Sequence, residues 1–274
     1  MRNLVLDCAV TNCKWQQLHR FHALLVVFVL VLCLPATADK LTTAGSGKVV
    51  EIVDGDTLIL HDGREVRLVG IQAPKLPLGR RNFKTWPLAD EAKSALLALS
   101  LYKTVTLSYG GRRVDRYDRQ LAHLHDETGS WIQGEILRRG MARVYSFRDN
   151  RAQVAEMLAI EREARQAKRG IWWHAFYQVR HADNAKRHIG SFQLVEGTVR
   201  AVAVRRKYTC LNFYANWRDD FTIAIPARAH RMFKESGVDP EALQGGIVRV
   251  RGWITSRNGP TFDASHPEQI EILT

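Results

Sequence analysis

The chain has 274 residues, of which 25% are charged, and its net charge is +12. This length suits two domains of modest size, each large enough for its own core. The positive charge favours an anionic partner, most simply a nucleic acid, although basic residues spread over the surface for solubility would give the same sum. Three of the four cysteines precede residue 39, so a chain shortened there keeps only Cys210, which excludes an internal disulfide.

The first 38 residues have the features of an export signal. Three basic residues precede an apolar run at Ala23–Leu34, and Ala36-Thr37-Ala38 offers the small residues of a cleavage site. The run is too short for a membrane span, which needs about 20 residues. We expect residues 1–38 to be removed as a signal peptide, which leaves an exported protein, periplasmic or secreted, without stable membrane association. Loss of three basic residues and one acidic residue lowers the net charge from +12 to +10. An uncleaved N-terminal anchor is the alternative.

Val49–Pro74 contains the pattern on which the N-terminal domain is built. Two apolar runs flank Asp54-Gly55-Asp56-Thr57, and a second Asp-Gly turn precedes a third run at Val66–Ile71. Short apolar runs bounded by Asp-Gly turns are typical of hairpins, so we expect three consecutive strands joined by tight loops. Asp54 and Asp56 then lie together at one strand end. Their carboxylates can bind a hard cation such as calcium, or they can serve only the turn.

The residues that follow alternate between loops, helices and strands. Pro and Gly mark a strongly basic loop at Lys75–Pro87, and Asp90 and Glu91 suit the positive start of a helix. Further helices are predicted at Ile132–Arg139 and Arg151–Arg169, each followed by glycine, and further strands at Val105–Leu107 and Leu121–Leu124. This order predicts a small twisted barrel with packed helices, a mainly β fold of the α+β class.

Several separate motifs in this region occur in a characteristic order. The Asp54–Thr57 tetrapeptide is followed by a strand that carries Arg67 and ends in Gly70-Ile71-Gln72-Ala73-Pro74. Later come Asp115-Arg116-Tyr117-Asp118-Arg119 and a closing helix that ends in Gly170-Ile171-Trp172. In this order the chain resembles the staphylococcal nuclease, or thermonuclease, family, and we assign residues 47–174 to such a domain. The resemblance implies an oligonucleotide-binding-type (OB) barrel.

The resemblance also implies a calcium-assisted phosphodiesterase site. In the family, the carboxylates of Asp-Gly-Asp and the Asp of an Asp-Thr-Pro-Glu motif serve calcium, the Glu of that motif handles the water, and two arginines clamp the phosphate. Residues of this chain at matching positions are Asp54, Asp56 and Gln72 for the metal and Arg67 and Arg119 for the phosphate. Both arginines could instead form ordinary surface or turn salt bridges.

This chain departs from the family pattern at two of these positions. Gln72 replaces an Asp and removes one negative charge, on which calcium affinity depends. Lys75 replaces the Glu, and a lysine is a cation rather than a base at neutral pH. Loss of a general base typically costs roughly 100- to 10,000-fold in rate.

The remaining residues indicate a linker and a second domain. Residues 175–193 lack a clear period and are basic, so they are interpreted as a linker or extended arm. From Leu194 the chain reads as three strands, a helix at Ala227–Lys234, and two strands that include a hairpin through Asn258-Gly259. This order matches a five-stranded barrel, so we predict a second OB-like domain at 194–274.

Basic and aromatic side chains that could contact a single nucleic-acid strand occur in both domains. In the second domain the aromatic residues, which include Tyr208, Phe213 and Tyr214, could stack on bases or could instead fill the barrel. The predicted contact residues are Lys75, Arg80, Arg81, Lys84, Tyr145, Phe147, Arg205, Arg206 and Trp217.

Two functions of different classes are therefore open. One is an exported, calcium-assisted nuclease with a reduced site, in which Lys75, Arg67 and Arg119 stabilise phosphate charge. The other is a binding module that holds single-stranded DNA or RNA, or another polyanion, without cutting it. The retained acidic and arginine positions favour the first, and the two substitutions favour the second. Neither the oligomeric state nor a preference for DNA or RNA follows from the sequence.

Overall fold

The computed structural model describes residues 41–214 and 221–273. They belong to one compact unit, Thr37–Thr274. The predicted signal peptide, residues 1–38, and the predicted contact residue Trp217 lie outside the described residues. Among the helices of the described residues, none has the length and apolar character needed to span a membrane.

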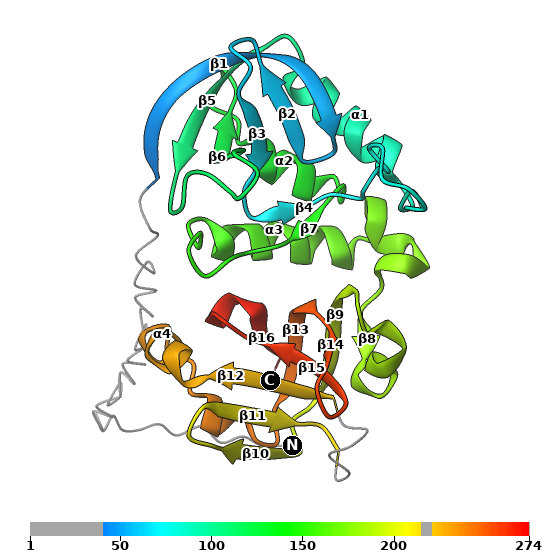
Figure 1. The fold of residues 1–274 in the computed structure, drawn as a ribbon, viewed down its shortest axis with the longest axis vertical. Coiled ribbons are helices and arrows are strands. Elements are labelled where there is room, and N and C mark those ends of the chain that lie inside the picture. Colours follow the sequence, from blue (N-terminus) through cyan, green and yellow to red (C-terminus); the bar gives the residue numbers. More distant parts are fainter. Residues whose placement is uncertain (1–40, 215–220, 274) are drawn as a thin grey trace, which may run out of the picture. The chain divides into compact units, whose positions relative to one another are not determined.

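Five strands close into a barrel in the N-terminal half of the described chain (Figure 1), with neighbours in the order β1-β2-β3-β6-β5. The strands are β1 (Thr42–Asp54), β2 (Thr57–Leu60), β3 (Glu65–Leu68), β5 (Thr104–Tyr109) and β6 (Gln120–His125). All pairs are antiparallel except β3 with β6, which is parallel. A separate two-stranded sheet joins β4 (Ile71–Gln72) to β7 (Arg143–Val144). The predicted mainly β fold with packed helices is confirmed.

Three α-helices accompany the barrel: α1 (Ala89–Ser100), α2 (Ile132–Arg138) and α3 (Val154–Gln166). Asp90 and Glu91 lie in the first turn of α1, as expected at the positive end of a helix dipole. The third helix begins three residues later than predicted. Short 3-10 helices follow at η1 (Gly170–Trp173) and η2 (Ala175–Tyr177).

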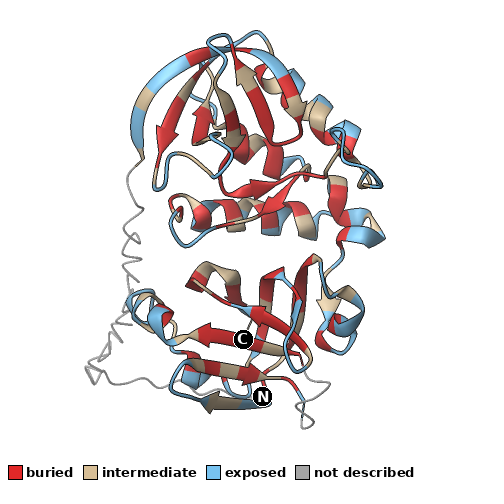
Figure 2. Cartoon of the chain, viewed as in Figure 1, coloured by how far each residue is buried: buried red, intermediate tan, exposed pale blue. Residues whose placement is uncertain are grey.

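The barrel and these helices enclose one apolar core, which Figure 2 shows as the buried faces of the strands. Leu58 and Leu60 of β2 are buried together with Leu96 of α1, Ile136 of α2 and Met157 of α3. Alternate residues of a strand point to the same face, so the period-2 pattern of β2 and β3 places its leucines and valines inward. This core fixes the strand ends on which the candidate site is built.

The C-terminal part consists of two sheets, where the sequence predicted one five-stranded barrel. One sheet has the order β10-β11-β12-β15-β14 and the other β16-β13-β9-β8, and side chains from both share one apolar core. The helical elements here are η4 (Ala227–Ala229), α4 (His230–Glu235), η5 (Pro240–Leu243) and η6 (Pro267–Gln269). The strands are β8 (Arg180–His181), β9 (Phe192–Thr198), β10 (Ala201–Val204), β11 (Tyr208–Asn212), β12 (Thr222–Pro226), β13 (Ile247–Trp253), β14 (Thr255–Ser256), β15 (Pro260–Asp263) and β16 (Ile270–Ile272).

Two local features of this part compare directly with the sequence expectations. The predicted hairpin through Asn258-Gly259 is present, since β14 and β15 pair antiparallel around it. The first of the three strands predicted from Leu194 onward is divided into β9 and β10, which belong to different sheets.

The segment interpreted as a basic linker is packed in the structure. It forms η2, the short strand β8 beside β9, and the 3-10 helix η3 (Ala182–His188). Ala182 and Ala185 are buried in the C-terminal core. Small apolar side chains within a mostly polar stretch give no periodic signal, which explains why the sequence indicated an arm.

Charged and apolar contacts connect the C-terminal sheets to α3 and η1. Arg251 of β13 donates to both carboxylate oxygens of Glu161 in α3, and it also pairs with Glu271 of β16. A third apolar cluster includes Trp172 of η1 and Phe192 and Leu194 of β9. The nuclease-like and C-terminal parts therefore share a packed, ion-paired boundary.

Candidate nucleic-acid site

Parallel pairing of β3 with β6 brings two predicted phosphate-binding arginines to one place. Val66 pairs with Gln120, and Arg67 pairs with Leu121. Arg119 immediately precedes this register, at the end of the turn that enters β6. Both Arg67 and Arg119 line a cavity of about 490 Å³. We call this cavity the arginine pocket.

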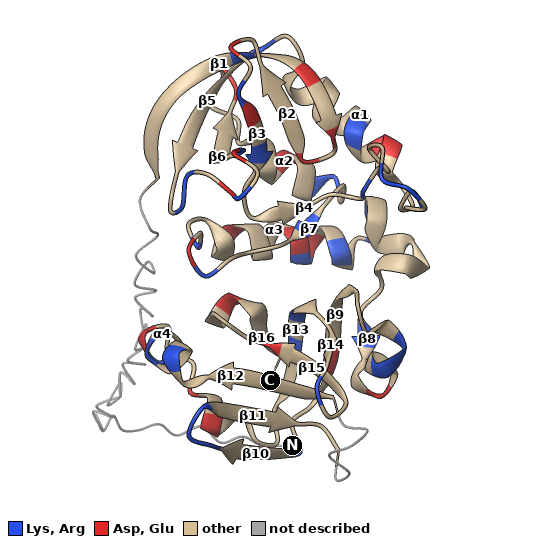
Figure 3. Cartoon of the chain, in the orientation of Figure 1, with Lys and Arg blue, Asp and Glu red and all other residues tan. Residues whose placement is uncertain are grey.

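The arginine pocket is rich in basic and aromatic side chains. The loop between β5 and β6 supplies Arg112, Arg116 and Tyr117 to its lining, and Figure 3 shows basic residues along this loop. Tyr145 and Phe147, both predicted contact residues, also line the pocket, with ring centroids 4.7 Å apart. Four arginines face two aspartates in the lining, so the pocket carries an excess of positive charge.

The ring of Tyr117, which lines the pocket, lies close to two arginines. The guanidinium carbon of Arg116 lies 4.7 Å from the centre of its ring, and that of Arg119 lies 5.3 Å away. The ring itself is largely exposed. An aromatic ring flanked by cations suits a nucleotide, because the ring can stack on a base while the cations meet its phosphate.

Asp115 holds Arg119 in this turn. Its carboxylate oxygen Oδ2 accepts from Nε and Nη2 of Arg119 at 2.9 and 2.7 Å. Partial burial raises the pKa of Asp115, but hydrogen bonds from Arg119 and from backbone amides outweigh it and lower the pKa below its usual value. The salt bridge suggested for Arg119 is therefore present, and it orients the guanidinium at the pocket.

Asp54 is the last residue of β1, and Asp56 lies in the two-residue turn that leads into β2, close together as the sequence predicted. Asp54 pairs with Thr57, and the backbone amide of Asp56 donates to Oδ1 of Asp54 at 3.0 Å. A side chain at Gly55 would meet the β-carbons of Ala73 and Ala92 at 2.7 Å, so glycine is required for helix α1 to approach this turn. Both carboxylates are buried.

The Lys75 ammonium group lies between these two carboxylates. Its Nζ donates to Oδ2 of Asp54 at 3.1 Å and to Oδ1 and Oδ2 of Asp56 at 2.6 and 2.8 Å. Its side chain is only 19% exposed. Lys75 therefore points into the acidic pair, whereas the sequence had assigned it to a nucleic-acid surface.

Arg67 connects the acidic pair to the arginine pocket. Its Nη2 lies 3.2 Å from Oδ2 of Asp56, and its guanidinium also donates to the carbonyl oxygens of Leu68 and Ile71 at 2.7 and 2.6 Å. These hydrogen bonds to the backbone fix the orientation of the guanidinium. Arg67 thus contacts Asp56 and also lines the arginine pocket. Asp54, Asp56, Gln72 and Lys75 are not part of the pocket lining.

Gln72 faces Arg143 and not the acidic pair. The two residues are cross-strand partners of β4 and β7. Oε1 of Gln72 accepts from Nε and Nη2 of Arg143 at 3.1 and 2.8 Å. Burial lowers the pKa of Arg143 to about 10, and its guanidinium also lies over the ring of Phe192.

These oxygens do not fit a calcium ion as the chain is folded. Calcium takes six to eight oxygen ligands. The carboxylates of Asp54 and Asp56 already accept from Lys75, Oδ2 of Asp56 also accepts from the amide of Ala73 at 2.7 Å, and the Gln72 oxygen is held by Arg143. Within the described ranges there is no group of three His, Cys, Asp or Glu side chains that could hold a metal.

The two aspartates differ in their electrostatics. Burial, together with the neighbouring Asp56, raises the pKa of Asp54. Burial also acts to raise the pKa of Asp56, but Arg67 and Lys75 outweigh it and lower that pKa. Asp56 is therefore the carboxylate that the two cations hold ionised.

The remaining predicted contact residues lie outside the arginine pocket. Arg80, Arg81 and Lys84 are exposed on the loop before α1, and Arg80 covers the ring of Phe83 at 3.6 Å. Arg205 and Arg206 are exposed between β10 and β11.

The aromatic residues named near β11 divide between surface and core. Phe213, for which the sequence left base stacking and core packing open, is buried against Phe221 in the C-terminal core, and Tyr208 is only partly exposed. The barrel-filling alternative is thus correct for Phe213. Tyr214 is exposed.

Sequence reasoning missed three residues of the pocket and one behind it. Arg112, Arg116 and Tyr117 line the pocket, and Arg143 holds Gln72. Arg116 and Tyr117 belong to the turn motif at 115–119, so their proximity to Arg119 in the sequence could have predicted their place beside it. The pairing of Arg143 with Gln72 joins two distant strands and has no local signature.

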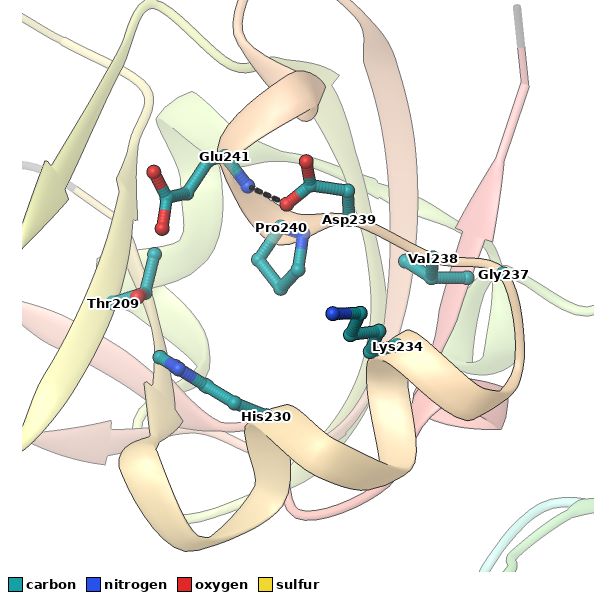
Figure 4. A pocket seen from close by; sticks show the side chains of 8 residues that line it. All are labelled: Thr209, His230, Lys234, Gly237, Val238, Asp239, Pro240 and Glu241. Atoms are coloured by element: carbon teal, nitrogen blue, oxygen red, sulfur yellow. Dashed lines mark hydrogen bonds between the residues drawn. The ribbon is translucent and has the colours of Figure 1, made fainter.

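A second cavity, of about 420 Å³, lies in the C-terminal part between β11, α4 and η5 (Figure 4). Lys234 and His230 of α4 line it opposite Glu241, and Oγ1 of Thr209 is buried there without a hydrogen-bond partner. Its lining contains one lysine, no arginine and no Phe, Tyr or Trp. Of these two cavities, only the arginine pocket combines several arginines with aromatic rings in its lining.

Comparison with known proteins agrees with this geometry. Residues 65–174 match the sequence profile described as "Staphylococcal nuclease homologue". An "Uncharacterized endonuclease" of Escherichia coli O157:H7 is 36% identical over 129 residues, which cover 46% of this chain and 76% of that protein. The chain belongs to the staphylococcal nuclease homologue family.

Further relatives in this family include proteins with and without a nuclease name. A "Micrococcal nuclease" of Shigella flexneri is 30% identical over 161 residues, covering 55% of this chain and 83% of that protein. "Protein ParB" of Escherichia coli is 32% identical over 161 residues, covering 53% and 78%. The family membership supports a nuclease-like protein that acts on nucleic acid. Asp54 and Asp56 precede the residues matched by the profile.

Proposed function

We propose that this protein binds single-stranded nucleic acid in the arginine pocket and that its phosphodiester cleavage is strongly reduced. The observation that carries the proposal is the shared position of Arg67 and Arg119 in one pocket with Tyr117 and Tyr145. Phosphates favour arginine because its planar donors form charge-assisted hydrogen bonds. The exposed bases of a single strand can stack on the tyrosine rings. A base-paired duplex does not offer its bases for such stacking.

The reduction in cleavage follows from the groups around the acidic pair. Hydrolysis needs a base or a metal to activate water. Lys75 occupies the position of the family's glutamate, and its ammonium is bound to Asp54 and Asp56. Asp115, a carboxylate within the pocket, is held by Arg119. Loss of a general base costs roughly 100- to 10,000-fold in rate.

Calcium-assisted hydrolysis is the competing proposal. It is favoured by the retained positions of Asp54 and Asp56 beside Arg67, which touches Asp56 and lines the pocket. It requires Lys75 to leave the acidic pair. The described contacts support the binding proposal instead, because Lys75 is held by three hydrogen bonds of 2.6 to 3.1 Å.

We also propose that the protein acts outside the cytoplasm. Three basic residues, the apolar run Ala23–Leu34 and the small residues at Ala36 and Ala38 support removal of residues 1–38 as a signal peptide. An uncleaved anchor is the alternative. In either case the working partner is a nucleic acid that is accessible to an exported protein.

Fluorescence anisotropy with a labelled single-stranded oligonucleotide tests the binding site. Arg119→Gln removes a phosphate contact, so we expect weaker binding and a salt slope reduced by about 1. Tyr117→Ala removes a stacking ring, and we expect a loss of about 1–3 kcal/mol in binding with an unchanged salt slope. Arg231→Gln, on exposed α4, is the matched control and should leave affinity unchanged. Equal losses in all three variants would remove the pocket from the proposal.

A further inference from the structure

We infer that Lys75 is a built-in cation that occupies the position of the family's metal, so that the folded chain does not take up calcium there. The inference concerns the acidic pair, Asp54 and Asp56, which lies beside the arginine pocket, and it does not depend on nucleic-acid binding. It rests on three contacts from one ammonium to two buried carboxylates.

Charge balance is the first argument. Two acidic side chains, Asp54 and Asp56, face two basic ones, Lys75 and Arg67, so the cluster needs no added cation to balance its carboxylates. Burying an unpaired charge is costly, and a buried carboxylate pair therefore needs internal or bound cations. In this chain both cations belong to the polypeptide.

Hydrogen-bond geometry is the second argument. Nζ of Lys75 reaches three carboxylate oxygens between 2.6 and 3.1 Å, which matches the three donors of an ammonium group. A calcium ion would have to displace these donors and find further oxygens. The Gln72 oxygen, which the resemblance assigns to the metal, is held by Arg143 instead.

The fold keeps Lys75 in this position. Its carbonyl oxygen accepts from the amide of Trp86 at 3.0 Å, and Ala73, two residues earlier, donates to Oδ2 of Asp56 at 2.7 Å. The backbone on both sides of the side chain is thus anchored, and the neighbouring Pro74 is buried. Lys75 is a positioning residue that neutralises the acidic pair, and it is not a free cation on the surface.

Thermal unfolding of the full chain, with chelator or with millimolar calcium, tests this inference without any substrate. Wild type should melt at the same temperature in both conditions. Lys75→Met keeps the length of the side chain but removes its charge, so in chelator it should melt roughly 5–15 °C lower. Calcium should raise the melting temperature of this variant, because the two carboxylates are left without their second cation. Lys84→Met, an exposed lysine on the same loop, should behave as wild type.

A charge-rescue variant and a direct binding measurement complete the test. Asp54→Asn with Lys75→Met removes one charge of each sign, so it should melt above Lys75→Met in chelator and lose the response to calcium. Isothermal titration of wild type with calcium should give no binding heat from the acidic pair. The wild-type and Asp54→Asn titrations should therefore be the same. A wild-type melting temperature raised by calcium, or such a heat, would overturn the inference. The inference would also be overturned if Lys75→Met melted at the wild-type temperature in chelator, or if calcium did not raise the melting temperature of Lys75→Met. These outcomes leave the oligonucleotide titration untouched, so this inference and the proposed nucleic-acid binding fail separately.

Discussion

Nη1 of Arg251 lies 2.9 Å from Oε2 of Glu161, and both side chains are buried. The pair joins strand β13 of the C-terminal part to helix α3, which packs against the nuclease-like barrel. Burial acts to lower the pKa of Arg251, but Glu161 and Glu271 outweigh it and raise that pKa. The charges compensate each other inside the protein, so we expect this pair to contribute to the stability of both parts.

Removing one member of this buried pair should destabilise the whole protein. Glu161→Gln leaves Arg251 without half of its negative partners, and we expect a loss of about 3–5 kcal/mol in the free energy of unfolding. Urea denaturation measures it. Glu235→Gln, which breaks the exposed pair with Arg231, should be indistinguishable from wild type. Equal stability of Glu161→Gln and wild type would show that the boundary does not rely on this pair.

Stability should fall on mild acidification because of buried histidines. Burial lowers the pKa of His266 to about 4, from an ordinary value of 6.5. The two ring nitrogens of His266 form hydrogen bonds with the hydroxyl groups of Ser146 and Ser265. The unfolded chain therefore binds this proton at a higher pH than the folded chain does. The contribution is fully present above pH 6.5 and is lost as the pH falls from 6.5 to about 4.

The histidine contribution can be separated from that of the carboxylates by substitution. The shift of His266 corresponds to roughly 3 kcal/mol when the loss is complete. His266→Gln should flatten the stability profile between these pH values, although His123, whose pKa is also lowered to about 4 by burial, retains part of the slope. Urea titrations at a series of pH values measure this. An unchanged slope in His266→Gln would contradict the account.

Export should remove the first 38 residues. The small residues at Ala36 and Ala38 suit signal peptidase, so N-terminal sequencing of the exported protein should begin at Asp39. Intact mass gives the same information independently. Recovery of the full-length chain in a membrane fraction would favour the anchor alternative.

Restoring the two substituted positions should create a calcium response. Lys75→Glu removes the internal cation and supplies a base, and Gln72→Asp adds a negative charge next to Arg143. We expect the double variant to bind calcium and to cleave single-stranded DNA orders of magnitude faster than wild type. Each single variant should gain less, because a base acts only on water that is already held near metal and phosphate.

Arg119 supplies the control for this restoration. Arg119→Ala in the restored background should remove most of the gain, since a phosphate clamp acts on charge that develops during reaction. A restored variant that binds calcium but cleaves nothing would mean that the loop after Lys75 no longer has nuclease geometry. Binding of nucleic acid without turnover would then be the whole function.

The sequence predicted the parts of the site that local chemistry or family resemblance determines. The tight turn at Gly55 places Asp54 and Asp56 close together, because a two-residue hairpin loop restricts the backbone to a few turn types. Arg67 and Arg119 line one pocket because β3 and β6 pair in parallel, an arrangement that the family's barrel implies and that local sequence patterns do not.

The rest of the site depends on side-chain contacts across long sequence distances. Whether Lys75 points outward to a phosphate or inward to Asp56 is decided by the burial of the acidic turn under α1, which the sequence alone does not specify. The same holds for Gln72, whose partner Arg143 lies on a strand far along the chain. Phe213 was also left open by the sequence, because an aromatic residue near a strand end can face either the core or the solvent.

The most direct test of the central claim uses a single-stranded oligonucleotide that reports both binding and cleavage. Full-length wild type is titrated at several salt concentrations, in calcium or in chelator. The account predicts equal, salt-sensitive binding in both conditions, because arginines hold the phosphates and Lys75 fills the cation position, with no acceleration of cleavage by calcium. Cleavage by wild type that calcium raises by orders of magnitude, or binding that requires calcium, would contradict it.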